Sequence, residues 1–382
     1  MEDFIHLHVH TYYSLLDGQS PVEKLVDKAI ANGMRGMAIT DHGNMFGVKE
    51  LFNYCNKVNG KLKKEGKEPF KPIFGCEMYV AHRKKSDRVK EKGDMGGYHL
   101  IVLAKNYNGY KNLIKLVSRA WVDGYYMRPR TDREDLEKYH EDLIVCSACI
   151  AGEVPAKILK NDIAGAREAV EWYKNMFGDD YYLELQRHEV RDPHQRANRE
   201  TFPLQQQANK VLMELAKEYG IKLVCTNDCH FVNQDNAEAH DHLLCLATGK
   251  DLDDPNRMLY TKQEWFKTRE EMNEVFADVP EALSNTLEIL DKVEFYSIDH
   301  SPIMPFFPIP KEFGTEEDTR KRITPEELFR EFTTDENGND IMSQEEAESK
   351  IKKLGGIDKL YRIKFEADYL AKLAYDGAKR LS

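Results

Sequence analysis

The sequence reads HLHVHTYYSLLDG from His6 to Gly18, with three histidines on alternate positions and Asp17 seven residues after the last of them. Alternation is the side-chain period of a β-strand, so His6, His8 and His10 share one face of the strand that we expect over residues 4–10. Imidazoles gathered on one face and a nearby carboxylate raise the hypothesis of a metal site. Its other ligands must come from elsewhere in the chain.

Composition limits the class of protein. Of 382 residues, 41% are hydrophobic and 32% are charged, which is an ordinary globular balance. No apolar run reaches the ~18 residues of a membrane span, and MEDFIHLH is no signal peptide, so we expect no membrane association. Seven cysteines, an odd number scattered along the chain, argue against a disulfide framework and indicate a reducing cytosol. The formal net charge of −11 argues against nucleic-acid binding as the main task and suits a metal site.

Apolar runs rich in Val, Ile, Leu and Tyr predict seven strands, at residues 4–10, 36–42, 70–80, 98–104, 142–148, 181–188 and 222–231. Helical patterns lie between them, at residues 21–32, 112–120, 166–177 and 203–220. Strands that alternate with helices imply a parallel sheet, and this number of units favours a closed barrel. The chain lacks GxGxxG and GxxxxGK[ST], so the dinucleotide and P-loop fingerprints do not apply.

The character of the chain changes after about residue 300. A Pro-rich and then highly charged segment predicts an extended connector. Residues 334–353 are polar, and we expect them to be partly mobile. Residues 357–382 form a long helical pattern with no core of its own, which suggests a chain cut from something longer. We therefore divide the chain into residues 1–250 (a metal-binding barrel), 251–310 (a post-barrel extension) and 311–382 (a charged linker and a final helix).

Metal-competent side chains stand at the ends of six of the seven predicted strands, namely His8, His10, Asp17, Asp41, His42, Glu77, His99, Cys149, Asp228 and His230. In a parallel barrel the carboxyl ends of the strands open on one rim, so we expect these residues close together. Imidazole, carboxylate and thiolate bind zinc, and mixed N/O donors also suit manganese or iron. So many donors suit two or three ions that share bridging carboxylates, and paired ions clamp phosphoryl groups and activate water.

The remaining histidines and cysteines have simpler interpretations. We expect His6 to be a hydrogen-bonded core residue. Surface or structural roles are expected for His82, His140, His240, His242 and His300. Small-hydrophobe roles are expected for Cys55, Cys76, Cys146, Cys225, Cys229 and Cys245. Two questions stay open: His188 either contacts substrate or is a polar rim residue, and the basic run 83–92 is either a solvated loop or a phosphate contact.

Seven short motifs, in order, resemble a known family: HVHT, SLLDG, ITDHGNM, GCEMYV, YHLIVLA, CSACIAGE and TNDCHF. Together they resemble the PHP (polymerase and histidinol phosphatase) domain, and more narrowly that of bacterial DNA polymerase III alpha subunits of the DnaE type. The likeness is dense over residues 1–310 and loose beyond. It implies an α/β fold, a distorted TIM-like (β/α)7 barrel with a mainly helical C-terminal extension, and it makes residues 311–382 a linker and the start of a polymerase palm.

The resemblance also assigns roles to residues. Its motifs imply nine metal ligands, and none departs from the metal-binding pattern: His8, His10, Asp17, His42, Glu77, His99, Cys149, Asp228 and His230. The alternation of side chains along a strand does not decide whether Cys146 or Cys149 is the metal ligand. The family motif implies Cys149. Glu77 and Asp228 are the candidate bridging, catalytic carboxylates, and Asp41 is expected to support His42 from behind.

Three functions then compete. The first is a phosphoesterase with 3′→5′ exonuclease (proofreading) activity, holding two or three divalent transition metal ions, most simply zinc, with manganese or iron as alternatives. The second is a stand-alone phosphatase similar to histidinol phosphatase. The third is a metal-braced docking module for a separate proofreading subunit. The resemblance implies a bacterial cytoplasmic replication protein whose partners are the DNA primer 3′ end, the rest of the alpha subunit and other replicase subunits. It also implies that the polymerase carboxylates lie beyond residue 382.

Overall fold

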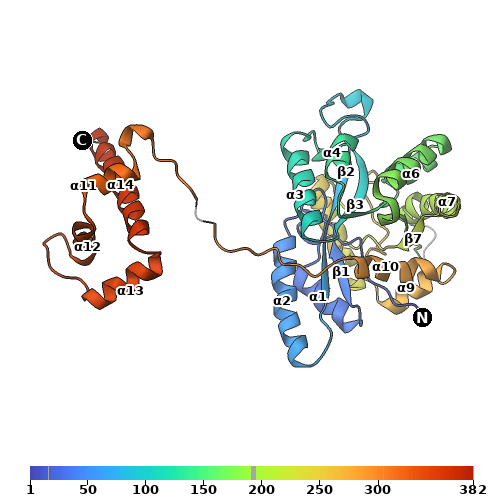
Figure 1. Cartoon of the computed structure of the whole chain (residues 1–382). Coiled ribbons are helices and arrows are strands. Elements are labelled where there is room, and N and C mark those ends of the chain that lie inside the picture. Colours follow the sequence, from blue (N-terminus) through green and yellow to red (C-terminus); the bar gives the residue numbers. More distant parts are fainter. Residues whose placement is uncertain (16, 191–194, 304, 382) are drawn as a thin grey trace. The chain divides into compact units, whose positions relative to one another are not determined.

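The computed structural model describes residues 1–15, 17–190, 195–303 and 305–381 (Figure 1). The chain forms two compact units, Met1–His300 and Ser301–Ser382, and each is treated by itself. Residues 251–300 are hydrogen-bonded to the barrel. The amide of Ile5 donates to Thr286 Oγ1, and the amide of Phe266 donates to the Phe231 carbonyl. Among the described residues, none of the helices has the length and apolar character needed to span a membrane.

The first unit is built on a curled, mixed sheet. Its strands are β1 (Gly36–Ile39), β2 (Lys71–Val80), β3 (Tyr98–Ala104), β4 (Arg130–Thr131), β5 (Leu143–Cys146), β6 (Tyr181–Leu185) and β7 (Lys222–Cys225). The order is β1-β2-β3-β5-β6-β7, and the short β4 pairs with β2. The predicted α/β barrel of the PHP type is confirmed, but the expected all-parallel sheet is wrong, because β3 is antiparallel to both β2 and β5.

The reversal of β3 matters for the site. His99 is the second residue of β3, so a parallel strand would have placed it at the end of the barrel away from the other metal-competent residues. In the antiparallel register His99 lies opposite Tyr79, near the carboxyl end of β2. The reversed direction of β3 therefore brings His99 to the end of the barrel where Glu77 and the end of β2 lie, which the predicted parallel direction would not have done.

The N-terminal segment closes the barrel. The predicted strand over residues 4–10 forms only an isolated bridge, between Val9 and Cys229. On one side the amide of His10 donates to the Cys229 carbonyl at 2.7 Å. On the other, the amide of Ala38 in β1 donates to the His6 carbonyl at 2.9 Å. The segment thus joins the chain that follows β7 to β1, and both edges of the sheet are covered.

Helices surround the curled sheet (Figure 1). They are α1 (Val22–Ala31), α2 (Val48–Lys64), α3 (Tyr107–Val122), α4 (Arg133–Tyr139), α5 (Glu153–Leu159), α6 (Ile163–Phe177), α7 (Arg196–Tyr219), α8 (Ala237–Thr248), α9 (Arg269–Val275) and α10 (Pro280–Lys292). Short 3₁₀ turns cover Lys90–Lys92, Gly178–Asp180 and Gln234–Asn236, with a fourth, Lys311–Phe313, in the second unit. Apolar residues at helical spacing face inward, as in α6, where Ala166, Val170 and Tyr173 are buried.

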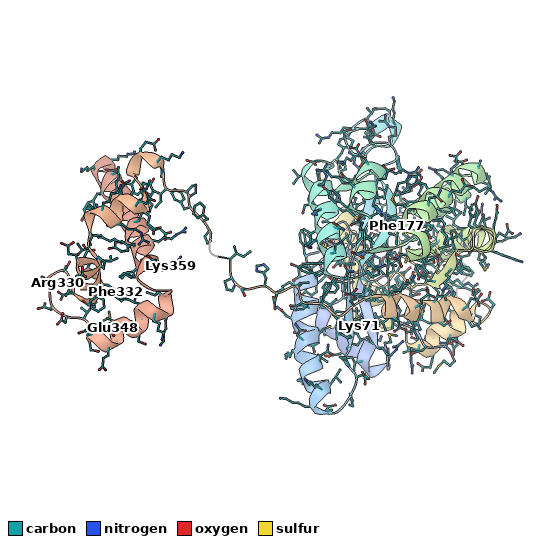
Figure 2. All side chains as sticks on the ribbon, viewed as in Figure 1. Lys71, Phe177, Arg330, Phe332, Glu348 and Lys359 are labelled. Atoms are coloured by element: carbon teal, nitrogen blue, oxygen red, sulfur yellow. The ribbon has the colours of Figure 1, made fainter. Side chains whose placement is uncertain are left out.

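The second unit is helical and has a small core of its own. Its helices are α11 (Glu316–Arg322), α12 (Pro325–Thr333), α13 (Gln344–Leu354) and α14 (Ile357–Leu381). Leu328, Ile351, Leu360 and Tyr361 form the core, and Phe332 packs against it (Figure 2). The expectation of a coreless final helix is therefore wrong, because Leu360 and Tyr361 of α14 belong to this core. The core is assembled from one or two apolar residues of each of three helices.

A buried arginine organises the loop between β2 and β3. Arg130 is fully buried, and its guanidinium donates to the carbonyls of Gly124, Asp94, Lys85 and Asp87 at 2.6–3.1 Å. Two cations of the basic run 83–92 are paired: Lys85 Nζ lies 2.7 Å from Asp135 Oδ2 of α4, and Arg83 pairs with Asp94. These two side chains are therefore engaged within the protein and are not held free for a phosphate.

The first prediction tests this role of Arg130. Arg130→Met leaves four carbonyls without their donor, so we expect a loss of about 3–5 kcal/mol in the free energy of unfolding. Denaturant titration followed by circular dichroism measures it. Arg88→Met, an exposed arginine of the same loop, is the matched control and should change stability by less than about 0.5 kcal/mol. Equal effects of the two substitutions would contradict the assignment.

Candidate metal centre

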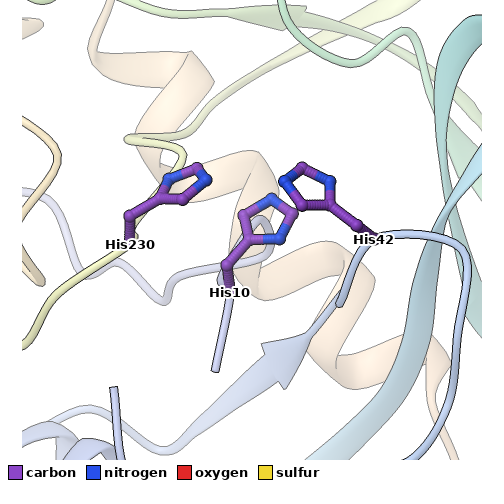
Figure 3. A group of neighbouring side chains, drawn as sticks. All are labelled: His10, His42 and His230. Atoms are coloured by element: carbon purple, nitrogen blue, oxygen red, sulfur yellow. The ribbon is translucent and has the colours of Figure 1, made fainter. Parts of the chain in front are cut away.

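The predicted ligands converge on one end of the barrel. Three groups of side chains each bring their donor atoms within 4.8 Å of one another. The groups are His10, His42 and His230 (Figure 3); His8, His10 and Asp228; and Glu77, His99 and Cys149. In Figure 3 the three imidazoles of the first group point toward a common space from separate segments of the chain. All nine residues meet here, since Asp17, the one outside these groups, contacts His42.

Two carboxylates lie at the centre of the cluster, those of the buried Glu77 and the partly buried Asp228. Glu77 contacts His99 Nδ1 at 2.7 Å and His8 Nε2 at 3.3 Å, and its other oxygen contacts His42 Nδ1. Asp228 Oδ1 lies 3.0 Å from His8 Nε2 and 3.2 Å from His10 Nε2. Each carboxylate therefore touches donors of more than one group, which is the position that a bridging ligand requires.

Hydrogen bonds set the orientation of three imidazoles. His8 Nδ1 lies 2.7 Å from Glu184 Oε1, and His10 Nδ1 lies 2.9 Å from Ser14 Oγ. His230 Nδ1 lies 2.8 Å from the Asp228 carbonyl. A carboxylate and a carbonyl only accept, so Nδ1 of His8 and His230 carries the proton, and Nε2 keeps its lone pair for the cluster.

Several polar atoms of the cluster are buried without a hydrogen-bond partner among the described residues. They are His8 Nε2, His10 Nε2, Asp17 Oδ1 and Asp228 Oδ1. A lone pair of His8 Nε2 and an Asp228 oxygen face each other at 3.0 Å, which is favourable only with a proton or a cation between them. The donor set and its unpaired atoms therefore fit bound metal ions.

The same demand for positive charge appears in the pKa values. Burial would raise the pKa of Asp228, but the neighbouring His8 and His10 hold it well below its usual range. Burial opposes the charged form of His42, yet Glu77 and Asp17 raise its pKa to about 10. Burial, together with the charges of His42 and His230, lowers the pKa of His10 to about 3, so this imidazole is neutral, as a metal ligand must be.

Backbone strain is present next to two of the predicted ligands. Asp228 has a φ of 46°, and Ala148, the residue before Cys149, has a φ of 61°. Residues other than glycine rarely adopt this left-handed backbone conformation, which costs of order 1–3 kcal/mol. The surrounding fold holds both segments in it, and Asp228 Oδ1 and Cys149 Sγ reach the cluster from them.

Two further predictions need correction. Asp41 does not contact the His42 side chain; it accepts from the Thr11 amide at 2.7 Å and from Ser14 Oγ at 2.8 Å. Since Ser14 Oγ donates to Asp41, it accepts from His10 Nδ1, so Asp41 orients His10 rather than His42. His188 is buried, and its nitrogens meet the Asn227 carbonyl and Gln205 Nε2. This geometry does not support a substrate contact through the imidazole of His188.

Three functional candidates escaped sequence reasoning. Glu184 orients His8, and Ser14 orients His10. Tyr260 OH lies 3.1 Å from His230 Nε2 and 3.4 Å from Asp17 Oδ2. Glu184 stands alone inside an apolar strand, YYLEL, which was an available signal of a buried charged group. Tyr260 lies in the segment that we expected to follow the barrel.

The other histidines behave as expected. His6 Nε2 contacts the Lys267 carbonyl at 2.8 Å inside the core, and His240 Nε2 donates to the Asp17 carbonyl at 2.7 Å. His82, His242 and His300 are exposed, and His140 is partly exposed.

A cavity of about 610 Å³ lies over the cluster. Its lining includes four residues of the cluster and its surroundings, namely Asp17, His42, His99 and Tyr260. Several exposed aromatic and apolar residues complete the lining. Its volume is typical of ligand sites, which measure ~300–1,000 Å³. The cluster is therefore accessible to a substrate.

Comparison with known proteins identifies the family. A model of the PHP domain matches residues 6–188. DNA polymerase III subunit alpha of Borreliella burgdorferi is 42% identical over 329 residues, 85% of this chain and 27% of that protein. The Treponema pallidum subunit is 38% identical over 331 residues, 86% of this chain and 26% of that protein. The chain thus spans about a quarter of the length of these curated relatives.

Among solved structures, one similar chain is described as a putative metal-dependent phosphoesterase from Bifidobacterium adolescentis. It is 14% identical, with a TM-score of 0.33, and the match covers 60% of this chain and 88% of that chain. Another is histidinol phosphate phosphatase from Lactococcus lactis, with 17% identity and a TM-score of 0.30 over 60% of this chain and 87% of that chain. From the PHP match and the identity with the curated relatives, we conclude that the chain belongs to the PHP-domain family of DNA polymerase III alpha subunits.

Proposed function

We propose that this chain is the phosphoesterase part of a bacterial DNA polymerase III alpha subunit and removes nucleotides from a DNA 3′ end, as a 3′→5′ proofreading exonuclease does. The observation that carries the proposal is the convergence of nine donors beneath an open cavity, with buried Nε2 and Oδ1 atoms left unpaired. Such a donor set has no simpler use in a fold whose other buried polar groups are largely hydrogen-bonded.

The three groups suggest how two or three ions would be held. Imidazoles dominate two groups, and the third adds the Cys149 thiol to Glu77 and His99. Nitrogen and sulfur donors favour zinc, while the carboxylates also suit manganese or iron. Glu77 and Asp228 would bridge neighbouring ions, because each contacts histidines of more than one group.

Bound ions of this kind polarise a phosphoryl oxygen and lower the pKa of water toward neutrality. The chain's own residues supply the rest. Glu184 and Ser14 fix the rings of His8 and His10, and burial raises the pKa of Tyr260, so its hydroxyl stays a proton donor beside the cavity. Hydrolysis needs no serine or cysteine nucleophile in this scheme.

The setting of the activity is also a proposal. The matched segment makes up only about a quarter of the curated relatives, so polymerisation, DNA as template and assembly with other replicase subunits belong to proteins of their full length. For this chain we propose the DNA primer 3′ end, the rest of the alpha subunit, a separate proofreading subunit and the bacterial cytoplasm as partners and location.

The second prediction concerns metal content. Purified chain should carry two or three transition metal ions, with zinc in excess, because the donors are mostly imidazole with one thiol. Elemental analysis measures this. A chelator should lower the melting temperature, since the ions offset the charge of the buried Glu77 and of the partly buried Asp228. Less than about one ion per chain after remetallation would exclude the multinuclear site.

The third prediction concerns hydrolysis. Metal-loaded chain should shorten 5′-labelled single-stranded DNA from its 3′ end, and Glu77→Ala and Asp228→Ala should each reduce the rate by more than about 100-fold, because losing a bridge disrupts two sites. Circular dichroism and metal analysis accompany each variant. His300→Ala, an exposed histidine outside the cluster, should leave the rate unchanged. Intact DNA with fully loaded wild-type chain would favour the docking-module alternative.

The fourth prediction isolates the residue behind His8. Glu184→Leu removes the acceptor of His8 Nδ1 and should weaken metal affinity by about 10–100-fold. Glu184→Gln retains an acceptor oxygen and should restore most of the affinity. Competition with a coloured zinc chelator measures both. If Glu184→Gln were as weak as Glu184→Leu, the charge rather than the orientation of His8 would be responsible.

A further inference from the structure

The outer wall of the cavity over the cluster is aromatic and exposed. Phe46, Trp121 and Tyr125 line it, with exposed fractions of 57%, 43% and 47%. The rings of Trp121 and Tyr125 are stacked, with centroids 5.6 Å apart and planes at 21°. The Phe46 ring lies 6.4 Å from that of Trp121. We name these three residues the aromatic wall. Because these rings are so exposed, they contribute little to the hydrophobic core, and core packing does not explain their presence.

The aromatic wall is fixed to the metal-binding loops. Trp121 Nε1 donates to the Gly43 carbonyl at 2.8 Å, and the Gly43 amide donates to the Glu77 carbonyl at 2.8 Å. Gly43 has a φ of 62°, and a Cβ there would lie 2.6 Å from Pro129 Cγ, so the two loops pack closely at this glycine. The wall is thus held in place beside His42 before any ligand arrives.

A cation stands at the edge of the same cavity. Arg128 is exposed, lines the cavity and lies 5.6 Å from the centre of the Tyr79 ring. Within the described ranges it forms no ion pair with a carboxylate. An unpaired guanidinium beside a candidate phosphoryl-transfer site is placed to accept a phosphate.

We propose that the aromatic wall stacks the 3′-terminal bases of single-stranded DNA while Arg128 contacts a backbone phosphate. The proposal rests on the proposed phosphodiester chemistry, since it concerns the substrate of the same cavity. Aromatic stacking tolerates every base, which suits an enzyme that must remove any nucleotide. It also fits the net charge of −11, because a chain with this charge gains little from long-range attraction and must obtain its affinity from contact with bases.

The proposal is tested by comparing the affinities of wild-type and variant chains for two DNA probes, without measuring hydrolysis. The probe is a short fluorescein-labelled oligothymidylate whose 3′ linkages are phosphorothioate to prevent cleavage, compared with the same oligonucleotide lacking its 3′-terminal bases. Metal-loaded wild-type chain should bind the complete probe on the order of tenfold more tightly than the abasic one, as one stacked base provides. Fluorescence anisotropy gives both dissociation constants.

Variants assign the discrimination to the aromatic wall. Trp121→Leu should bind both probes equally, and Trp121→Phe should retain most of the preference because a ring remains. Tyr107→Leu is the matched control, since Tyr107 lies at the other end of α3 with the same 43% exposed fraction, and it should leave the preference unchanged. Arg128→Met should weaken both probes alike, because the phosphates are common to them.

The results separate this proposal from the proposed function. Equal binding of both probes by wild-type chain, no binding of either, or full discrimination by Trp121→Leu would overturn base stacking, even if DNA were hydrolysed. Discrimination that depends on Trp121 without any hydrolysis would support stacking and contradict the exonuclease instead.

Discussion

The burial of negative charge inside the barrel is the constraint on which the rest of the structure depends. Among the histidines, the side chain of Glu77 is 1% exposed and that of Asp228 is 15% exposed, and an isolated buried carboxylate costs several kcal/mol. Protons on neighbouring imidazoles can offset that charge, as the raised pKa of His42 indicates, but bound cations do so without protonating the ligands. The hydrogen bonds of Glu184 and Ser14, and the strained backbone at Asp228, all serve to keep this charged centre in one arrangement.

Much of this centre could be predicted because its residues occur in short, ordered motifs. Alternation placed His8 and His10 on one face, and the pairing of Asp228 and His230 followed in the same way. The direction of β3 could not be predicted, because an apolar strand has the same composition in either direction. Asp41 was assigned to His42 from adjacency in sequence, whereas the structure shows contacts made across the turn that holds Ser14. Tyr260 was missed since its partners lie far away in the chain.

The C-terminal unit shows a second limit of sequence patterns. Its high charge suggested an extended linker, yet four apolar residues contributed by three helices suffice for a small core. Capping boxes at Thr315 and Thr324 begin two of its helices, and such local signals were present in the sequence. Composition averaged over this segment hid both features, because a small core requires only a few residues per helix.

The closure of the barrel by its first segment has a consequence for synthesis. His6 and Cys229 touch although they are 223 positions apart, and the neighbouring ligands His8 and Asp228 depend on the same closure. A nascent chain on the ribosome therefore exposes its first histidines long before their partners emerge, and the full donor set can form only after His230 has left the exit tunnel. Contacts of such long range fold slowly. If metal ions bind as proposed, their ligands from both ends of this unit would close one very large loop of the polypeptide at a late stage of folding.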